Sequence, residues 1–295
     1  MSNISSPKSK FSNTHFLGVA FMLAASLCFS TGGLLIKLIP WSPLAINGVR
    51  NLIACAVVGL YLLIIRHPLK FNLTVLIGAI SLTGVTTLFS VANKLTTAGN
   101  TIILQYTAPI WIVILMFLIF GQKPDRKSLI SILIVFAGIL FFFLESLSTG
   151  KWLGDFCALI SGIFYAGVFM LNSFEKGDAL SSVFFGQVLC GVAFSPMVLQ
   201  EADFSLPVLA AVFVLGAVQV GLAYIFFTTG TKYTGPVTAS IIGAIEPILN
   251  PVLVAIFYKE MLGKYSLLGG AIVLVGILYY NLRDHVKMKT AHSAS

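Results

Sequence analysis

Ten long apolar stretches follow one another along the chain, and short polar connections separate them. A helix needs about 20 apolar residues to cross the roughly 30 Å of hydrocarbon in a membrane. Stretches of that length predict helices and not the shorter, alternating strands of a β-barrel. We therefore predict an all-α integral membrane protein with ten transmembrane helices, at 16–39, 43–65, 73–93, 97–119, 127–144, 152–174, 179–199, 206–230, 236–258 and 265–282.

The two ends of the chain are polar and are expected to be tails, at 1–15 and 283–295. The first apolar stretch begins like a secretory signal peptide, but it continues to Ile39 and is too long for the apolar part of such a signal. We therefore assign it to the first span. Because the connections are too short for a soluble domain, any activity is expected inside the helical bundle.

Positive charges are distributed unequally between the two sides of this topology. If the N-terminus is cytoplasmic, 12 Lys and Arg residues lie in cytoplasmic segments and five lie outside. Positive residues favour the cytoplasmic side, so both termini are expected to be cytoplasmic. The formal net charge of +8 then indicates contact with anionic membrane lipid and not with nucleic acid. A composition with 58% apolar and 9% charged residues likewise excludes an ordinary soluble domain.

The chain also contains an internal repeat. When it is shifted against itself by 138 positions, Lys94 aligns with Lys232, and Pro109 aligns with Pro247. This predicts two repeats of five spans each, at 16–144 and 152–282. Because five is odd, the two repeats must have opposite orientations in the membrane. Inverted repeats are typical of secondary transporters, whose substrate site lies near the midplane between the repeats.

Several motifs resemble the drug/metabolite transporter superfamily, and within it the EamA-type carriers. They are "IEPILNPVLVAIFYKEML" followed by "LLGGAIVLVGILYY", the first-half echo "YTAPIWIVILMFLIFGQK", Arg50 in "NGVRNLIACAVV", and the Gly154–Asp155 pair. The resemblance implies a ten-helix carrier in a bacterial inner membrane that exports amino acids or related metabolites by alternating access. One position departs from the pattern, because Gln122 stands where the first half of the family usually has an acid.

Three prolines predict helix breaks inside the spans: Pro109, Pro247 and Pro251. Proline has no backbone N–H, so Pro109 frees the carbonyl of Gln105, and Pro247 frees that of Gly243. In hydrocarbon such a break is tolerated only where it faces protein or a water-filled cavity. Breaks at matching positions of two repeats indicate the binding site of a transporter.

Polar side chains share a helix face with these breaks. Glu246 and Asn250 are four residues apart in the second repeat, and Thr101 and Gln105 are four apart in the first. An acid at membrane depth is a functional-site candidate by default. We therefore predict that Glu246 holds a proton, a cation or a substrate ammonium group. The alternative is that it only caps the freed helix end or forms a hydrogen bond with a neighbouring span.

Arg50 lies seven residues inside the second predicted span, on a polar stripe with Asn47 and Asn51. At 1.5 Å per residue its depth is about 10 Å, which the long side chain can span to reach the interface. Interfacial anchoring and a place in the cavity wall are both open, and pairing with Glu246 is a further hypothesis. Asp155, near the start of the sixth span, is expected to be an interfacial acid at a helix start.

Aromatic and amide side chains complete the candidate site. Three tyrosines inside the spans suit a cationic or aromatic substrate, although plain helix packing is the alternative for each. The predicted substrate-binding residues are Arg50, Thr101, Gln105, Tyr106, Tyr165, Gln219, Tyr224, Glu246 and Asn250.

The sequence contains no motif of an enzyme or a metal site. The four histidines lie at span ends or in tails, the four cysteines lie inside spans without metal-ligand spacing, and a phosphate-binding GxxxxGK[ST] loop is missing. We therefore expect no metal and no cofactor. A secondary transporter of a small molecule, with a proton as candidate coupling ion, is favoured over a membrane-embedded enzyme and over a receptor or scaffold.

Overall fold

The computed structural model describes residues 7–170, 174–234, 242–243 and 245–293, and every regular element in this part of the chain is a helix. Residues 171–173 of one predicted span, the beginning of the predicted span at 236–258, and the extreme ends of the two tails lie outside the described residues.

The first half of the chain forms seven described helices. They are α1 (Pro7–Ser30), α2 (Gly32–Leu38), α3 (Pro43–Ile64), α4 (Leu73–Leu95), α5 (Ala98–Gln105), α6 (Ala108–Phe120) and α7 (Arg126–Thr149). The first predicted span is therefore interrupted at Thr31, between α1 and α2, and the fourth is interrupted between α5 and α6.

The second half adds α-helices and two segments of other helical types. The elements are α8 (Trp152–Met170), α9 (Ala179–Phe194), the 3-10 helix η2 (Ser195–Gln200), α10 (Leu206–Val214), the π-helix η3 (Leu215–Leu222), α11 (Ala223–Thr234), α13 (Glu246–Tyr258) and α14 (Lys264–Ser293). The elements α10, η3 and α11 follow one another without a gap. The π-helical turn in their middle contains Gln219.

Within the described residues, seven segments are long and apolar enough to cross a membrane: Phe16–Leu38, Pro43–Ile64, Leu73–Leu95, Ala98–Phe120, Trp152–Met170, Ala179–Gln200 and Leu206–Thr234. Two shorter apolar helices, Glu246–Tyr258 and Lys264–Tyr279, accompany them. Large apolar side chains such as Leu63 and Leu133 are at least 70% exposed on the outside of the bundle. So much exposed apolar surface fits contact with lipid, and the chain is a multi-pass membrane protein.

Side-chain caps fix where several of these helices begin. Ser42, Asn72, Thr97 and Asp178 each accept a hydrogen bond from the backbone N–H three residues later. Each cap satisfies one of the donors that a helix start leaves without a partner. Pro43 follows Ser42 at the start of α3, where a missing N–H costs nothing.

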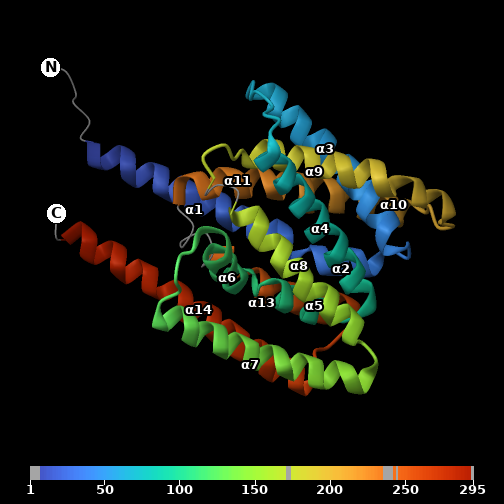
Figure 1. Ribbon diagram of the computed structural model, residues 1–295. Helices are drawn as coiled ribbons and strands as arrows, with labels where there is room; N and C mark the ends of the chain where they lie inside the picture. Colours follow the sequence, from blue (N-terminus) through green and yellow to red (C-terminus); the bar gives the residue numbers. More distant parts are fainter. Residues whose placement is uncertain (1–6, 171–173, 235–241, 244, 294–295) are drawn as a thin grey trace.

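The helices pack in pairs that join the two halves of the chain. α7 packs on α14, α4 on α8, α1 on α11, and α3 on α9. In Figure 1, α7 and α14 lie side by side along one edge of the molecule, and α1 and α14 have their terminal ends at the same end of the bundle. Helices of the first half therefore contact helices of the second half throughout the core.

Candidate functional site

The structure interrupts a helix beside each of two predicted prolines. α5 ends at Gln105, α6 begins at Ala108, and Pro109 lies in the first turn of α6. In the second half α13 begins at Glu246, and Pro247 lies in its first turn. In each case the proline stands where a helix start has no need of its N–H.

Pro251 differs from the expectation, because α13 continues through it to Tyr258. A single proline removes one hydrogen bond from a helix, and the bonds on either side can hold the helical path. Pro251 is therefore a position inside a continuous helix and not a break.

Tyr106 joins the two interrupted regions. It follows α5 directly, and its hydroxyl lies 2.7 Å from the carbonyl oxygen of Gly243 and 2.8 Å from Oε2 of Glu246. Pro247 has no N–H and cannot donate a hydrogen bond to the carbonyl of Gly243. The side chain of one half therefore occupies the place of the missing backbone donor in the other half.

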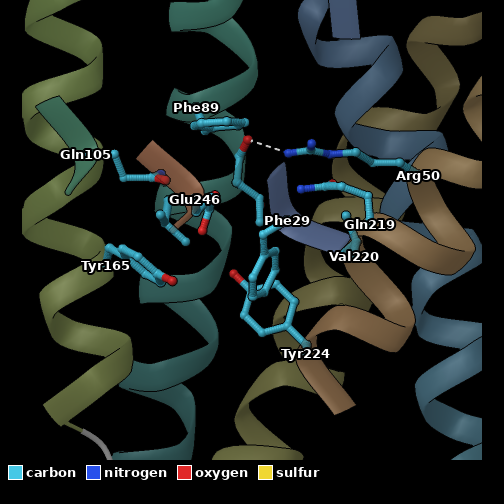
Figure 2. Close-up of a pocket in the computed structure, with 11 residues that line it drawn as sticks. Phe29, Arg50, Phe89, Gln105, Tyr165, Gln219, Val220, Tyr224 and Glu246 are labelled. Carbon is cyan, nitrogen blue, oxygen red and sulfur yellow. Dashed lines mark hydrogen bonds between the residues drawn. The ribbon is translucent and has the colours of Figure 1, made fainter. Parts of the chain in front are cut away.

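A buried cavity of about 40 Å³ lies next to Glu246, between the two halves. This space holds a few water molecules, so a larger solute needs the walls to separate. The lining residues are Phe29, Arg50, Val85, Thr86, Phe89, Gln105, Tyr165, Gln219, Val220, Tyr224 and Glu246. In Figure 2 the side chains of Arg50 and Gln219 enter the cavity from one side, and those of Gln105, Tyr165 and Glu246 from the opposite side.

Arg50 is buried in the cavity wall, with 1% of its surface exposed. Its Nη2 donates to the carbonyl of Thr86 at 2.8 Å and to Oδ1 of Asn47 at 3.1 Å, and its Nε also donates to Asn47. The alternative of an anchor extending to the interface is therefore wrong, because the guanidinium is held between α3 and α4. These charge-assisted hydrogen bonds stabilise the buried charge of the guanidinium.

Glu246 is also buried, with 5% of its surface exposed, and its carboxyl group contacts Tyr106. No ion pair joins Arg50 to Glu246 in the described part of the chain. The hypothesis that the two pair directly is therefore wrong for this state. A guanidinium and a carboxyl group instead face one cavity while each keeps its own hydrogen-bond partners.

Aromatic rings form much of the remaining wall. Phe29 meets Tyr224 edge to face, with ring centroids 5.1 Å apart and an interplanar angle of 79°. Tyr165 packs against Tyr106 in the same manner, at 6.3 Å and 71°. Gln105 donates from Nε2 to the hydroxyl of Ser161 at 3.3 Å, which fixes the amide at the cavity edge.

Six of the nine predicted binding residues line this cavity: Arg50, Gln105, Tyr165, Gln219, Tyr224 and Glu246. Three do not. Tyr106 stands behind Glu246, where it lines a smaller cavity of about 20 Å³ together with Pro109. Thr101 donates to the carbonyl of Thr97 in its own helix.

Asn250, the third of these residues, is fully buried away from the cavity, against α2. A Cβ placed on Gly33 would lie 2.3 Å from Oδ1 of Asn250, so this amide needs glycine at that position. The shared helix face of Glu246 and Asn250 therefore separates into a cavity side and a packing side.

Sequence reasoning missed the apolar members of the wall. Phe29, Val85, Phe89 and Val220 line the cavity, but nothing distinguishes them from other apolar residues of their spans. Thr86 belongs to a group of hydroxyl residues in α4, and its backbone carbonyl is the part that contacts Arg50. A hydroxyl pattern alone does not reveal a contact of the backbone.

One end of the bundle is closed by polar contacts between the halves, which we call the Lys37 cluster (Lys37, Thr96, Ala98, Asp155 and Glu260). Lys37 pairs with Glu260 at 2.8 Å and donates to the carbonyl of Thr96. The other carboxylate oxygen of Glu260 accepts from the N–H of Ala98 at 2.8 Å. Asp155 lies in the first turn of α8, as expected of an acid at a helix start, but it is fully buried and accepts from the hydroxyl of Thr96 at 2.6 Å.

The opposite end, beyond the C-terminus of α3, holds the Asp178 cluster (His67, Lys70, Asp178 and Ser181). Asp178 lies 3.1 Å from Nε2 of His67 and 3.7 Å from Nζ of Lys70. Partial burial acts to raise the pKa of Asp178, but hydrogen bonds from Ser181 and the neighbouring His67 outweigh it, and the pKa is lowered from its ordinary value. A wider pocket of about 450 Å³ lies at this end and is lined by residues that include His67, Asp178 and Lys232.

The chain is similar to a family and to proteins that are named as transporters. The model of the EamA-like transporter family matches residues 16–144 and 152–282. An uncharacterized transporter of Archaeoglobus fulgidus is 26% identical over 178 residues, covering 60% of this chain and 64% of the relative. The uncharacterized transporter YwfM of Bacillus subtilis is 27% identical over 289 residues, covering 93% of this chain and 96% of the relative.

One solved crystal structure of a protein resembles this fold with a TM-score of 0.63 and 17% sequence identity, covering 92% of this chain and 98% of that one. At this identity the likeness concerns the fold alone. The family match covers nearly all of the apolar part of the chain and agrees with the resemblance of the Glu-Pro motifs. The chain belongs to the EamA-like transporter family, and it is a membrane transporter.

Proposed function

We propose that the protein is a secondary active transporter that exports amino acids or related small metabolites by alternating access across a bacterial inner membrane. The observation that carries this proposal is the shared cavity of Arg50 and Glu246, two ionisable groups that do not pair with each other. An amino acid carries a carboxylate and an ammonium group. Arg50 suits the carboxylate and Glu246 suits the ammonium group.

Two inverted repeats of five helices are part of this proposal. The family model matches residues 16–144 and 152–282, which are the predicted repeats. The α6 and α13 helices support the same arrangement, because each is followed by a residue in the left-handed conformation. These are Gly121 with φ 66° and Lys259 with φ 58°, which lie 138 positions apart.

Helix pairing supports the repeat as well. If the first and sixth spans correspond, and the third and eighth, the contact of α1 with α11 has its counterpart in the contact of α4 with α8. The pair α3 and α9, and the pair α7 and α14, each join corresponding spans. An axis relating the halves would pass between the members of these pairs, close to the cavity.

Alternating access is supported by the closure of the cavity. The Lys37 cluster seals one end with contacts between the halves, and the wider pocket lies at the end of the Asp178 cluster. The two clusters are separated by α3, whose 22 residues span about 33 Å at 1.5 Å per residue. In this proposal a solute enters from one end only after the contacts there separate.

Orientation follows from charge and shape together. The terminal ends of α1 and α14 lie at the same end of the bundle (Figure 1), and an even number of spans requires this. The excess of Lys and Arg favours the cytoplasm for both termini. The wider pocket would then open to the cytoplasm, as an exporter needs for loading.

Ligand binding to the purified protein tests the proposed substrate class. Thermal unfolding in detergent is measured with free amino acids, with their N-acetyl derivatives and with their methyl esters. A ligand at 100 times its Kd stabilises the folded protein by about 2.7 kcal/mol. We expect stabilisation by some free amino acids and its loss when either charged group is blocked. Equal stabilisation by blocked and free forms would overturn the assignment of Arg50 and Glu246.

The matched variants are Glu246→Gln and Arg50→Gln, with Glu175→Gln and Arg126→Gln as controls at exposed positions. The first two are expected to lose stabilisation by the amino acid, and the controls are expected to keep it. If no amino acid stabilises the parent protein, the same assay with other small metabolites decides between a different substrate and a protein that binds none.

A further inference from the structure

The hydroxyl of Tyr106 lies between two oxygen atoms that both accept hydrogen bonds. The carbonyl oxygen of Gly243 is 2.7 Å away, and Oε2 of Glu246 is 2.8 Å away. A phenol has a single hydroxyl proton and can donate it fully to one of them. The number of protons in this group of three therefore decides whether both contacts can be hydrogen bonds at once.

The carbonyl of Gly243 has lost its helical donor. In a continuous helix the N–H four residues later would serve it, but that residue is Pro247. Gly243 and Glu246 are buried, and Tyr106 is 9% exposed. A buried carbonyl needs a partner, and among the described residues the Tyr106 hydroxyl is a donor within hydrogen-bond distance.

With a proton on Glu246, all three groups are satisfied. The carboxyl O–H donates to the Tyr106 oxygen, and the Tyr106 O–H donates to the Gly243 carbonyl. Without that proton, the carboxylate and the carbonyl compete for one O–H. Either the carboxylate or the carbonyl is then left without its donor.

The surroundings of Glu246 offer no other strong donor at hydrogen-bond distance among the described residues. The ionisable groups that face it across the cavity are Arg50 from α3, Tyr165 from α8 and Tyr224 from α11. Lys37, from α2, pairs with Glu260 beyond the far end of α13. Among the described residues, Tyr106 is therefore the group whose hydrogen bonds depend most directly on the protonation of Glu246.

We propose that Glu246 is a proton-binding site and that Tyr106 is the positioning residue that couples the proton to the helix break at Gly243. Loss of the proton turns the Tyr106 hydroxyl toward the carboxylate and releases the Gly243 carbonyl. Because Tyr106 belongs to the interrupted helix of the first half and Gly243 to that of the second, the proton changes a contact between the halves.

The link between this proton and transport rests on the proposed function, in which the ionised carboxylate of Glu246 accepts the substrate ammonium group. The exchange is balanced, because the protonated carboxylic acid and the ammonium ion give a carboxylate-ammonium pair and one proton, which leaves to water. Substrate and proton then compete for Glu246. The contact between the halves changes each time one replaces the other.

Hydrogen–deuterium exchange of the purified full chain tests the coupling without any substrate. The measured quantity is the protection of the peptide from Gly243 to Asn250 between about pH 5 and 9, corrected for the intrinsic exchange rate at each pH. The parent is expected to lose protection as the pH rises, by roughly two- to tenfold. This is the factor by which the loss of one ordinary hydrogen bond shifts the equilibrium for local opening of the helix start. Exchange without pH dependence in the parent would overturn the proposal.

Three variants distinguish the role of Glu246 from that of Tyr106. Glu246→Gln carries a permanent donor, so its protection is expected to be high at every pH. Tyr106→Phe is expected to have low protection at every pH, and Tyr265→Phe, at an exposed position, should behave as the parent. A Tyr106→Phe protein that keeps the parent's pH profile contradicts the role of Tyr106.

If Tyr106→Phe does not fold, the comparison of the parent with Glu246→Gln still decides whether Glu246 is the titrating group. A pH profile that survives in Glu246→Gln overturns the proton site. Because no substrate is present, these outcomes are separate from those of the amino-acid binding assay, which tests the proposed function.

Discussion

At the scale of single residues, Arg50 is the side chain whose surroundings are most completely defined. Its guanidinium donates to Asn47 and to the carbonyl of Thr86, and the rest of the group faces the cavity. A guanidinium can serve a wall and a ligand together because its donors point in several fixed directions. A lysine ammonium at the same place is a single point charge on a flexible stem.

Arg50→Lys is therefore expected to weaken substrate binding although the charge is kept. The lost contact to Asn47 or Thr86 also lowers the free energy of unfolding, by about 1–3 kcal/mol for a buried partner left unsatisfied. Amino-acid binding and thermal unfolding of the purified variant measure the two effects. Binding equal to that of the parent would contradict a direct role of the guanidinium.

Lys259 adopts the left-handed conformation at the end of α13, with φ 58°, whereas its repeat equivalent is Gly121. A residue with a Cβ is strained there, and glycine is not. Lys259→Gly is therefore expected to stabilise the protein by up to about 1 kcal/mol. Thermal unfolding in detergent checks this, with Lys264→Gly in α14 as a control that should not stabilise.

At the scale of elements, the two clusters at the ends of the bundle set which side is closed. Glu260 holds the connection between α4 and α5 through Ala98 and pairs with Lys37 of α2. The repeat-equivalent position in the first half is Gln122, which cannot form such an ion pair. We therefore expect the Lys37 cluster to favour the state that is closed at its own end.

Breaking the pair should open that end more often. The side chains of Lys37 and Glu260 are 11% and 20% exposed, and a pair worth about 1 kcal/mol changes the open population roughly fivefold. Glu260→Gln is expected to speed labelling of a cysteine placed by Phe29→Cys, in a background without the native cysteines. The double reversal Lys37→Glu with Glu260→Lys should slow it again, and unchanged labelling in Glu260→Gln would contradict a closing role.

The Asp178 cluster predicts acid sensitivity at the opposite end. The pKa of Asp178 is lowered in the folded state, so its contribution to stability is complete above the ordinary pKa of about 3.9 and is lost as the pH falls through the lower folded value. Thermal unfolding between about pH 3 and 6 measures the loss. Asp178→Asn should remove this part of the pH dependence, and Glu175→Gln should keep it.

At the scale of the whole molecule, the sequence was sufficient for the all-helical membrane class and for two of the interruptions. Length and apolarity predicted the seven segments of the described residues that are long and apolar enough to cross a membrane. Pro109 and Pro247 mark two interruptions, because proline lacks an N–H. The interruption at Thr31 has no proline and escaped prediction. It stands before Gly32 and Gly33, where Gln219 and Asn250 approach too closely for a Cβ, a tertiary contact that no local pattern encodes.

The candidate site was predictable only in its polar part. Burial of Glu246 and Arg50 in one cavity agrees with the rarity of charges at membrane depth. The rotation of α13 that turns Asn250 away, and the selection of Phe29 and Phe89 for the wall, depend on how the helices of the two halves pack. Side-chain spacing within one helix contains no information about the facing helix.

In the proposed transport cycle, a zwitterion crosses the membrane through the cavity between Arg50 and Glu246. Counterflow of labelled amino acids into proteoliposomes containing the purified protein tests it most directly. We expect saturable uptake by the parent and by Glu175→Gln, and a loss of at least about tenfold in Glu246→Gln and Arg50→Gln. A loss of this size is expected when a buried charged partner worth more than about 1.4 kcal/mol is removed. Undiminished uptake in both cavity variants would contradict it.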